Sequence, residues 1–170
     1  MHRTATTATA APGAVAAAPT AVSTVGAVDW DHPLDPRPGP QRDHVTSYVE
    51  TGGVDGHIWH GVPTLLLTTV GRISGRAVRT PLIYARDEDR YLTAASGYGA
   101  AAHPQWYRNL LAWPEARLQV GDRVLRATGR PATAEERDTY WPALTGRWPV
   151  FEDDQARVAR EIPLVLFDLL

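Results

Sequence analysis

The most informative stretch of this chain is Thr68-Thr69-Val70-Gly71-Arg72-Ile73-Ser74-Gly75-Arg76-Ala77-Val78-Arg79-Thr80-Pro81-Leu82, which continues the apolar run Leu65 to Leu67. It holds two glycines and three arginines and no acidic residue. Glycine lets a backbone turn tightly and expose its N–H groups, and the arginine guanidinium suits phosphates and carboxylates. The stretch is typical either of a strand that ends in an anion-binding loop or of a tight hairpin with solvated arginines. A glycine-rich loop by itself does not choose between them.

The residues on both sides of this loop predict a series of short strands. Apolar and β-branched residues bounded by turn residues predict strands over 62–70, 78–86 and 91–96, with a turn at 87–90. A short amphipathic helix is expected before the first strand, because apolar and aromatic residues recur there at helical spacing, at His44, Val45, Tyr48 and Val49.

The second half of the chain alternates helices with strands. Helices are expected over 103–113, from Thr133 to a stop or kink at Pro142, and around 153–160; Glu136 completes a capping box with Thr133. Strands are expected over 117–120, 123–128 and 162–167. Most strand connections are short enough for antiparallel pairing. The pattern therefore predicts an α+β fold, a small antiparallel barrel of about six strands with helices on its outside.

Composition bounds the class of protein. A chain of 170 residues suits one domain with a real core, and a net charge of −2 does not favour a nucleic-acid partner. The absence of cysteine excludes disulfides, thiolate chemistry and cysteine metal sites. No apolar run approaches the roughly 20 residues of a membrane span. A cytoplasmic location is expected, with peripheral membrane contact and the choice between monomer and homodimer left open.

The first 40 residues differ in composition from the rest. Ala, Thr, Val, Pro and Gly dominate them, and almost no large apolar side chain precedes Trp30. Such a segment buries too little surface to offset the entropy of ordering it. The sequence therefore predicts a disordered tail over 1–40 and a single domain over 41–170. The alanine-rich start is only a weak match to a signal peptide, since Pro12 and Pro19 interrupt it.

The six histidines do not have the spacing of a metal site. His57 and His60 lie three residues apart around Trp59, but no carboxylate pair is near them. No metal is therefore expected.

A few polar and aromatic groups are candidates for binding a ligand. Ser96 lies at a predicted strand end before a glycine-rich loop, where a hydrogen bond to a ligand is favoured over nucleophilic catalysis. Gln105 and Asn109 share one face of a helix and could address one edge of a heterocycle. Trp148 and Phe151 could wall a pocket for a flat molecule. Since no acid–base machinery is evident, a cofactor that carries the chemistry is favoured.

Five segments, in this order, closely resemble the deazaflavin (coenzyme F420)-dependent nitroreductase family: T-T-V-G-R-I-S-G-R-A-V-R-T-P-L, A-A-S-G-Y-G, H-P-Q-W-Y-R-N-L, A-E-E-R-D-T-Y-W-P and R-E-I-P-L-V-L. The resemblance covers about residues 41 to 168. It implies a small actinobacterial protein with a split β-barrel similar to FMN-binding proteins. It also implies hydride transfer from reduced coenzyme F420 to an electron-poor acceptor, namely a quinone, a nitro compound or an activated alkene.

The resemblance further implies a cofactor site. The phosphate and oligoglutamate tail of F420 suit the loop residues Arg72, Ser74, Arg76 and Arg79. The deazaflavin would be lined by Val78, Thr80, Pro81, Leu82, Ile83, Ala94, Ala95, Ser96, Gly97, Gln105, Trp106, Tyr107, Arg108 and Asn109. Ser96 is the candidate catalytic residue, and Trp148 and Phe151 remain the candidate substrate wall.

The chain also departs from the family pattern. Relatives usually carry lysine where this chain has Ile73, and often at Gly97. Where relatives show P-x-Y-x-x-Y-Q, residues 149–155 read P-V-F-E-D-D-Q, so both phenols are missing and Asp154 is the substitute to consider. These departures keep two alternatives open. One is an FMN-dependent split-barrel reductase, and the other is a non-enzymatic protein that binds a deazaflavin or another ligand.

Overall fold

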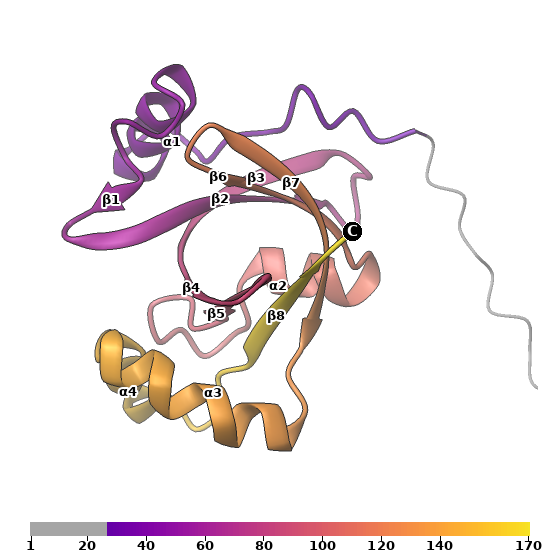
Figure 1. The fold of residues 1–170 in the computed structure, drawn as a ribbon. Helices are drawn as coiled ribbons and strands as arrows, with labels where there is room; N and C mark the ends of the chain where they lie inside the picture. The colour runs from indigo at the N-terminus through magenta and orange to yellow at the C-terminus, as the bar shows by residue number, and fades with distance from the viewer. Residues whose placement is uncertain (1–26) are drawn as a thin grey trace, which may run out of the picture.

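The computed structural model describes residues 27–170. Its strands are β1 (Ile58–Trp59), β2 (Val62–Val70), β3 (Ala77–Ile83), β4 (Ala85–Asp87), β5 (Arg90–Ala94), β6 (Glu115–Val120), β7 (Arg123–Pro131) and β8 (Leu164–Leu169). Its helices are α1 (Pro40–Glu50), α2 (Gln105–Ala112), α3 (Ala134–Arg147) and α4 (Val150–Arg157) (Figure 1).

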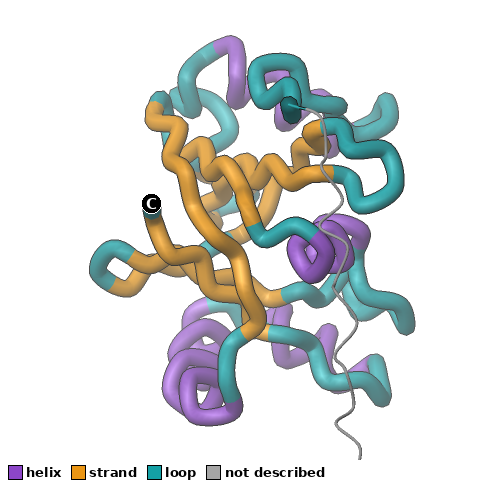
Figure 2. Tube along the Cα trace, turned by 90° about the vertical axis from the view of Figure 1, so that its right-hand side faces the viewer, coloured by secondary structure: helices purple, strands orange, loops and turns teal. Residues whose placement is uncertain are grey.

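The strands form one curled antiparallel sheet. Its order is β1-β2-β6-β7-β8-β5-β4, and β3 pairs with the remaining side of β2. Every strand pair is antiparallel, which confirms the predicted barrel class, although two very short strands bring the described total to eight rather than about six. The curl brings β2 and β3 opposite β5 and β8, and α2 lies between these two halves (Figures 1 and 2).

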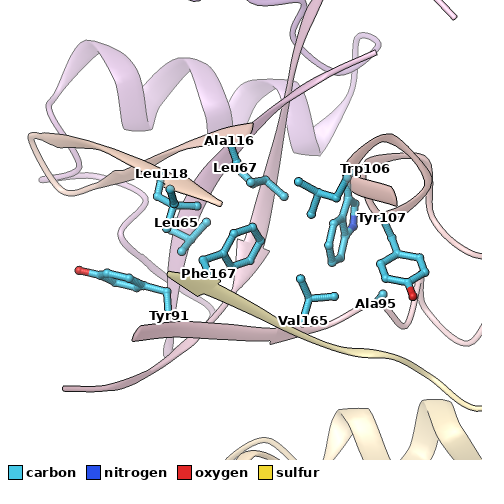
Figure 3. Close-up of a cluster of buried hydrophobic side chains, with 12 residues drawn as sticks. Leu65, Leu67, Tyr91, Ala95, Trp106, Tyr107, Ala116, Leu118, Val165 and Phe167 are labelled. Atoms are coloured by element: carbon cyan, nitrogen blue, oxygen red, sulfur yellow. The ribbon is translucent and has the colours of Figure 1, made fainter. Parts of the chain in front are cut away.

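The apolar strand β2 is buried on both faces. Leu65 and Leu67 point into the curl of the sheet, where they join the largest buried cluster with Trp106 of α2 and Phe167 of β8 (Figure 3). Leu66, one residue out of phase, packs against α1 on the opposite face. Successive side chains of a strand point to opposite faces. An unbroken apolar run is therefore what a strand between the barrel interior and a covering helix requires.

The outer face of the β5–β8 half is covered by α3 and α4. Leu92, Leu164 and Leu166 pack there against Leu144 of α3 and Phe151 of α4. The predicted capping box of α3 is confirmed: Thr133 Oγ1 accepts from the Glu136 N–H, and the Glu136 carboxylate accepts from the Thr133 N–H. The capping box therefore fixes where α3 begins after β7.

Two local predictions differ from the structure. Of the stop or kink expected at Pro142, the stop is wrong, because α3 continues to Arg147. Proline removes one hydrogen bond from the carbonyl four residues earlier, here that of Asp138, and Asp138 is exposed to solvent. The strand expected over 78–86 is divided into β3 and β4, with Tyr84 between them.

The ordered part of the chain begins before Gln41. The first 26 residues of the expected tail lie outside the described residues, but Leu34 forms a parallel bridge to Val78. The Leu34 N–H donates to the Ala77 carbonyl at 2.8 Å, and the Leu34 carbonyl accepts from the Arg79 N–H at 2.8 Å. The segment therefore covers the free edge of β3, and the tail boundary expected at residue 40 is too late.

Candidate active site: a cavity beside the arginine loop

A cavity of about 750 Å³ opens beside β3, the segment that follows β5, and the start of α2. One wall is the stretch Thr80 to Ile83 of β3. Trp106 of α2 and Ser96 belong to its lining as well, and α1, the β1–β2 hairpin and α4 supply further residues. A largely apolar hollow of this size is typical of small-molecule and cofactor sites.

The arginine loop, residues 71–76, is a tight turn between β2 and β3. The Gly71 N–H donates to the Arg76 carbonyl at 2.8 Å, and the Gly75 N–H donates to the Gly71 carbonyl at 2.7 Å. Gly75 has a φ of +67°, and a Cβ on Gly71 would lie 2.6 Å from Ser74 Oγ. Side chains at either position would strain or crowd the turn, which explains both glycines.

Helix α2 holds this turn at the edge of the cavity. Arg72 Nη1 donates to Gln105 Oε1 at 2.8 Å, and Gln105 lines the cavity. The buried Asn109 accepts from the Arg72 N–H at 3.1 Å and donates to Thr69 Oγ1 at 3.1 Å. Gln105 and Asn109 therefore have different roles. Gln105 lines the cavity, whereas Asn109 binds the turn to α2 through hydrogen bonds.

The arginines of the region have different surroundings. Within residues 27–170, Arg72, Arg76 and Arg108 form no ion pair with a carboxylate. Arg79 instead lies 3.5 Å from Asp35 and does not line the cavity. An anion would thus meet unpaired cations at the turn and at the start of α2, but not at Arg79.

The segment after β5 is fixed by one arginine. Arg160 donates from Nη2 to the Ser96 carbonyl at 2.7 Å and from Nε to the Ala100 carbonyl at 3.0 Å. Its Nη1 lies 3.2 Å from His103 Nδ1. Because arginine only donates, His103 Nδ1 accepts, and the neutral ring carries its hydrogen on Nε2.

His103 and Ser96, in the segment after β5, are two hydrogen-bond donors of the cavity wall. Burial, followed by the positive charges of Arg160 and Arg108, lowers the pKa of His103, so its ring is neutral at pH 7. The Ser96 hydroxyl belongs to a buried residue of the cavity wall. Both groups can donate a hydrogen bond to a ligand.

A second group of lining residues comes from α1 and the β1–β2 hairpin. His44 and Trp59 stack at 4.0 Å between ring centroids with their planes 14° apart. His60 meets Trp59 edge-on at 4.8 Å. Gln41 Nε2 donates to Tyr98 Oη at 2.6 Å, and both residues line the cavity, so this bond joins α1 to the segment after β5. The sequence does not predict this wall. Its pattern raises only the question of a metal site at His57 and His60 and gives no role to Trp59.

The three candidates around α4 are separated. Phe151 is buried and lines the cavity. Trp148 does not line it and packs at the edge of the cluster under α3 and α4. Asp154 is buried outside the cavity lining, where it accepts from Arg157 Nη1 at 3.2 Å.

The structure thus brings about half of the expected site residues to the cavity. Those that line it are Thr80, Pro81, Leu82, Ile83, Ala94, Ser96, Gly97, Gln105, Trp106 and Phe151. Those outside its lining are Arg72, Ser74, Arg76, Val78, Arg79, Ala95, Tyr107, Arg108, Asn109, Trp148 and Asp154. Of the second group, Arg72 is hydrogen-bonded to a lining residue, and Tyr107 and Ala95 belong to the core.

The described residues hold neither a metal-binding cluster nor a membrane-spanning helix. No group of three or more His, Cys, Asp or Glu side chains between residues 27 and 170 is arranged to hold a metal ion. Among the helices of the same range, none has the length and hydrophobicity needed to cross a bilayer.

The curled antiparallel sheet defines a split β-barrel protein. The chain belongs to the F420H(2)-dependent quinone reductase family, whose model matches residues 40–168.

Relatives of known sequence and structure agree with this assignment. An F420H(2)-dependent quinone reductase of Mycobacterium tuberculosis is 34% identical over 134 residues, which are 74% of this chain and 87% of that protein. A solved F420-H2 dependent reductase is 34% identical with a TM-score of 0.58, over 62% of this chain and 94% of that one. A solved domain-swapped dimer is 32% identical with a TM-score of 0.59, over 74% of this chain and 98% of that one.

Proposed function

We propose that this protein reduces quinones with reduced coenzyme F420. The observation that carries the proposal is the cavity itself, which is bordered at Gln105 by a turn whose arginines have no carboxylate partner within residues 27–170. Family membership supports the same reaction. When bound, reduced F420 supplies a hydride, and the chain's own residues hold, orient and shield the two reactants.

The residues present fit the cofactor. Arg72, Arg76 and Arg108 would bind its phosphate and glutamate carboxylates, for which arginine offers paired donors. The β3 wall and Trp106 would pack against the deazaflavin ring. Ser96 would donate its hydroxyl to a polar edge of the ring system or to the acceptor.

The remaining lining residues suit an aromatic acceptor. Phe151 and Trp59 offer ring faces against which a quinone can stack, and stacking of this kind is favourable when the rings are desolvated. His103 offers an N–H to a carbonyl oxygen, which would stabilise the negative charge that builds there after hydride transfer. We propose these residues as the acceptor side of the cavity.

Turnover of reduced F420 tests the proposal. The protein is mixed under anaerobic conditions with F420H2 and 1,4-naphthoquinone, and recovery of the oxidised cofactor's absorbance is followed against a protein-free control. Quinone-dependent oxidation is expected. Oxidation of reduced FMN but not of F420H2 would make the protein an FMN reductase. Tight F420 binding without turnover of quinones, nitro compounds or enones would make it a binding protein.

Location and assembly belong to the same proposal. We infer a cytoplasmic protein that acts as a monomer or homodimer. Cell fractionation tests the first inference and light scattering of the purified chain tests the second.

A further inference from the structure

The cavity wall contains a histidine to which the proposed function gives no role. His44 of α1 is 4% exposed, and its Nε2 lies 2.7 Å from the Gly56 carbonyl oxygen. A carbonyl oxygen only accepts, so Nε2 carries a hydrogen. Nδ1 is therefore the nitrogen that gains or loses a proton when this ring changes its charge.

The orientation of the ring is fixed by its neighbours. A Cβ on Gly56 would lie 3.0 Å from His44 Cδ2 and 3.2 Å from Nε2, so this edge packs against the Gly56 turn. One face stacks on Trp59. The opposite edge, which holds Nδ1, has no hydrogen-bond partner within the described chain. His44 lines the cavity, and Nδ1 is its polar atom without a hydrogen-bond partner among the described residues.

We propose that His44 donates the proton that completes reduction of the acceptor, an inference that rests on the quinone reductase function proposed above. Transfer of a hydride to a quinone leaves a hydroquinone monoanion, which still needs one proton on oxygen. The Nδ1–H bond of the His44 imidazolium breaks as the O–H bond forms. The ring is left neutral, with Nε2–H still donating to Gly56, and solvent returns the proton to Nδ1.

Other groups of the site are less suited to give up this proton. His60 and Tyr98 also line the cavity, but both are exposed to solvent, and the Tyr98 hydroxyl already accepts from Gln41. Phe151 lines the cavity but has no ionisable group, and Asp154 is paired with Arg157 outside the lining. His103 Nδ1 faces a permanent cation, Arg160, which opposes formation of a charged ring. His44 therefore remains as a buried group of the lining that can hold an exchangeable proton.

Several titratable and polar groups lie around His44. The nearest titratable group is Tyr48 on α1, whose ring centroid lies 6.1 Å from that of His44. The Tyr48 hydroxyl in turn lies 3.0 Å from His57 Nδ1, and His60 packs against Trp59. Thr64 on β2 lies 3.5 Å from His44 Nε2. No carboxylate of the described residues forms an ion pair with the ring.

The test compares His44→Gln with His57→Gln, because His57 is nearby but does not line the cavity. We expect His44→Gln to lower kcat for 1,4-naphthoquinone by about 100-fold, the scale of general acid catalysis, with little change in F420H2 binding. Wild-type kcat should fall as pH rises, because only the protonated ring can act. The His44 variant should lose this limb of the pH profile, and the His57 variant should keep it.

Nitrogen NMR of the cofactor-free protein gives a second readout. The neutral His44 ring should be the Nε2–H form, and addition of 1,4-naphthoquinone should shift its Nδ1 signal more than that of His57. An Nδ1–H ring, or a His44 variant that turns over with unchanged kcat and pH profile, would overturn the inference. If the wild-type protein does not oxidise F420H2, the proposed function fails instead, and the NMR result still decides the state of His44 even where the variant does not fold.

Discussion

Arg72 and Arg79 come from the same stretch of sequence but lie in different surroundings. Arg72 is bound to Gln105 at the cavity edge, whereas Arg79 is paired with Asp35. We predict that Arg72→Ala weakens F420 binding about tenfold, which corresponds to about 1.4 kcal/mol, and weakens it more for longer glutamate tails. Fluorescence titration with cofactors of different tail length measures the effect.

Arg79→Ala is the matched control, because it removes the same charge from the same stretch of sequence, in β3 rather than in the turn. Its affinity should be close to that of the wild-type protein. Equal losses for both variants would mean that overall charge, rather than the turn, attracts the cofactor. A loss in Arg72→Ala that is the same for a cofactor without its tail would contradict the role assigned to the turn.

At the scale of the elements, helix α2 approaches strand β7 through a glycine. A Cβ on Gly129 would lie 2.8 Å from Phe167 Cε1 and 3.0 Å from both Leu110 methyl carbons. We predict that Gly129→Ala destabilises the fold by roughly 1–3 kcal/mol, as overpacking of cores does. Gly146 in α3 has open space around it, and Gly146→Ala should stabilise by at most about 1 kcal/mol. Denaturant unfolding of the two variants should give changes of opposite sign.

An ion pair also joins the start of α3 to strand β7. The Arg130 guanidinium of β7 binds both Glu136 oxygens at 2.7 Å and, with the Thr133 N–H, lowers the pKa of that carboxyl to about 2. A carboxyl whose folded pKa is depressed stabilises the fold above its unfolded value, near 4.5, and this stabilisation is lost as pH falls toward 2.

Glu136→Gln should therefore flatten the dependence of unfolding free energy on pH between about 4.5 and 2. Glu135→Gln, a change at an exposed neighbour, is the control and should keep the wild-type slope. Urea unfolding at a series of pH values measures both. A Glu136 variant with the full acid slope would show that other carboxylates are responsible.

The elements were predictable where their signals are local. The β2 strand, the hairpin of β6 and β7, and the α3 capping box depend on residues close in sequence, and each was expected near its observed place. The course of α3 beyond Pro142 depends on solvent around Asp138, which a local pattern does not report. The pairing of Leu34 with β3 joins residues far apart in sequence, so composition alone indicated a tail.

At the scale of the whole molecule, the site was predictable only in part, because some of its residues are brought together from distant parts of the sequence. The glycine-rich turn and the segments around Ser96 and Trp106 have recognisable sequence patterns. The wall of His44 and Trp59 exists because α1 and the β1–β2 hairpin fold over the sheet. Similarly, Arg79 belongs to an arginine-rich pattern, but its pairing with Asp35 removes it from the cavity. Chain topology, rather than residue type, decided both outcomes.

The segment before α1 offers a test of the molecule as a whole. Leu34 covers the free edge of β3, and Trp30 stacks under the Arg117 guanidinium at 4.8 Å. Chains that begin at residue 27 and at residue 37 differ only in this segment. We predict that the shorter chain has a lower thermal midpoint by several degrees, the scale of about 1–2 kcal/mol in a domain of this size.

The same truncation should also change association, because an uncovered strand edge is a template for pairing with another chain. Light scattering should show concentration-dependent self-association of the chain that begins at residue 37, and less of it for the chain that begins at residue 27. Equal midpoints and equal association would mean that the segment lies on β3 without stabilising it. A lower midpoint without association would mean that the segment stabilises the barrel but that the exposed edge is protected by its own twist and side chains.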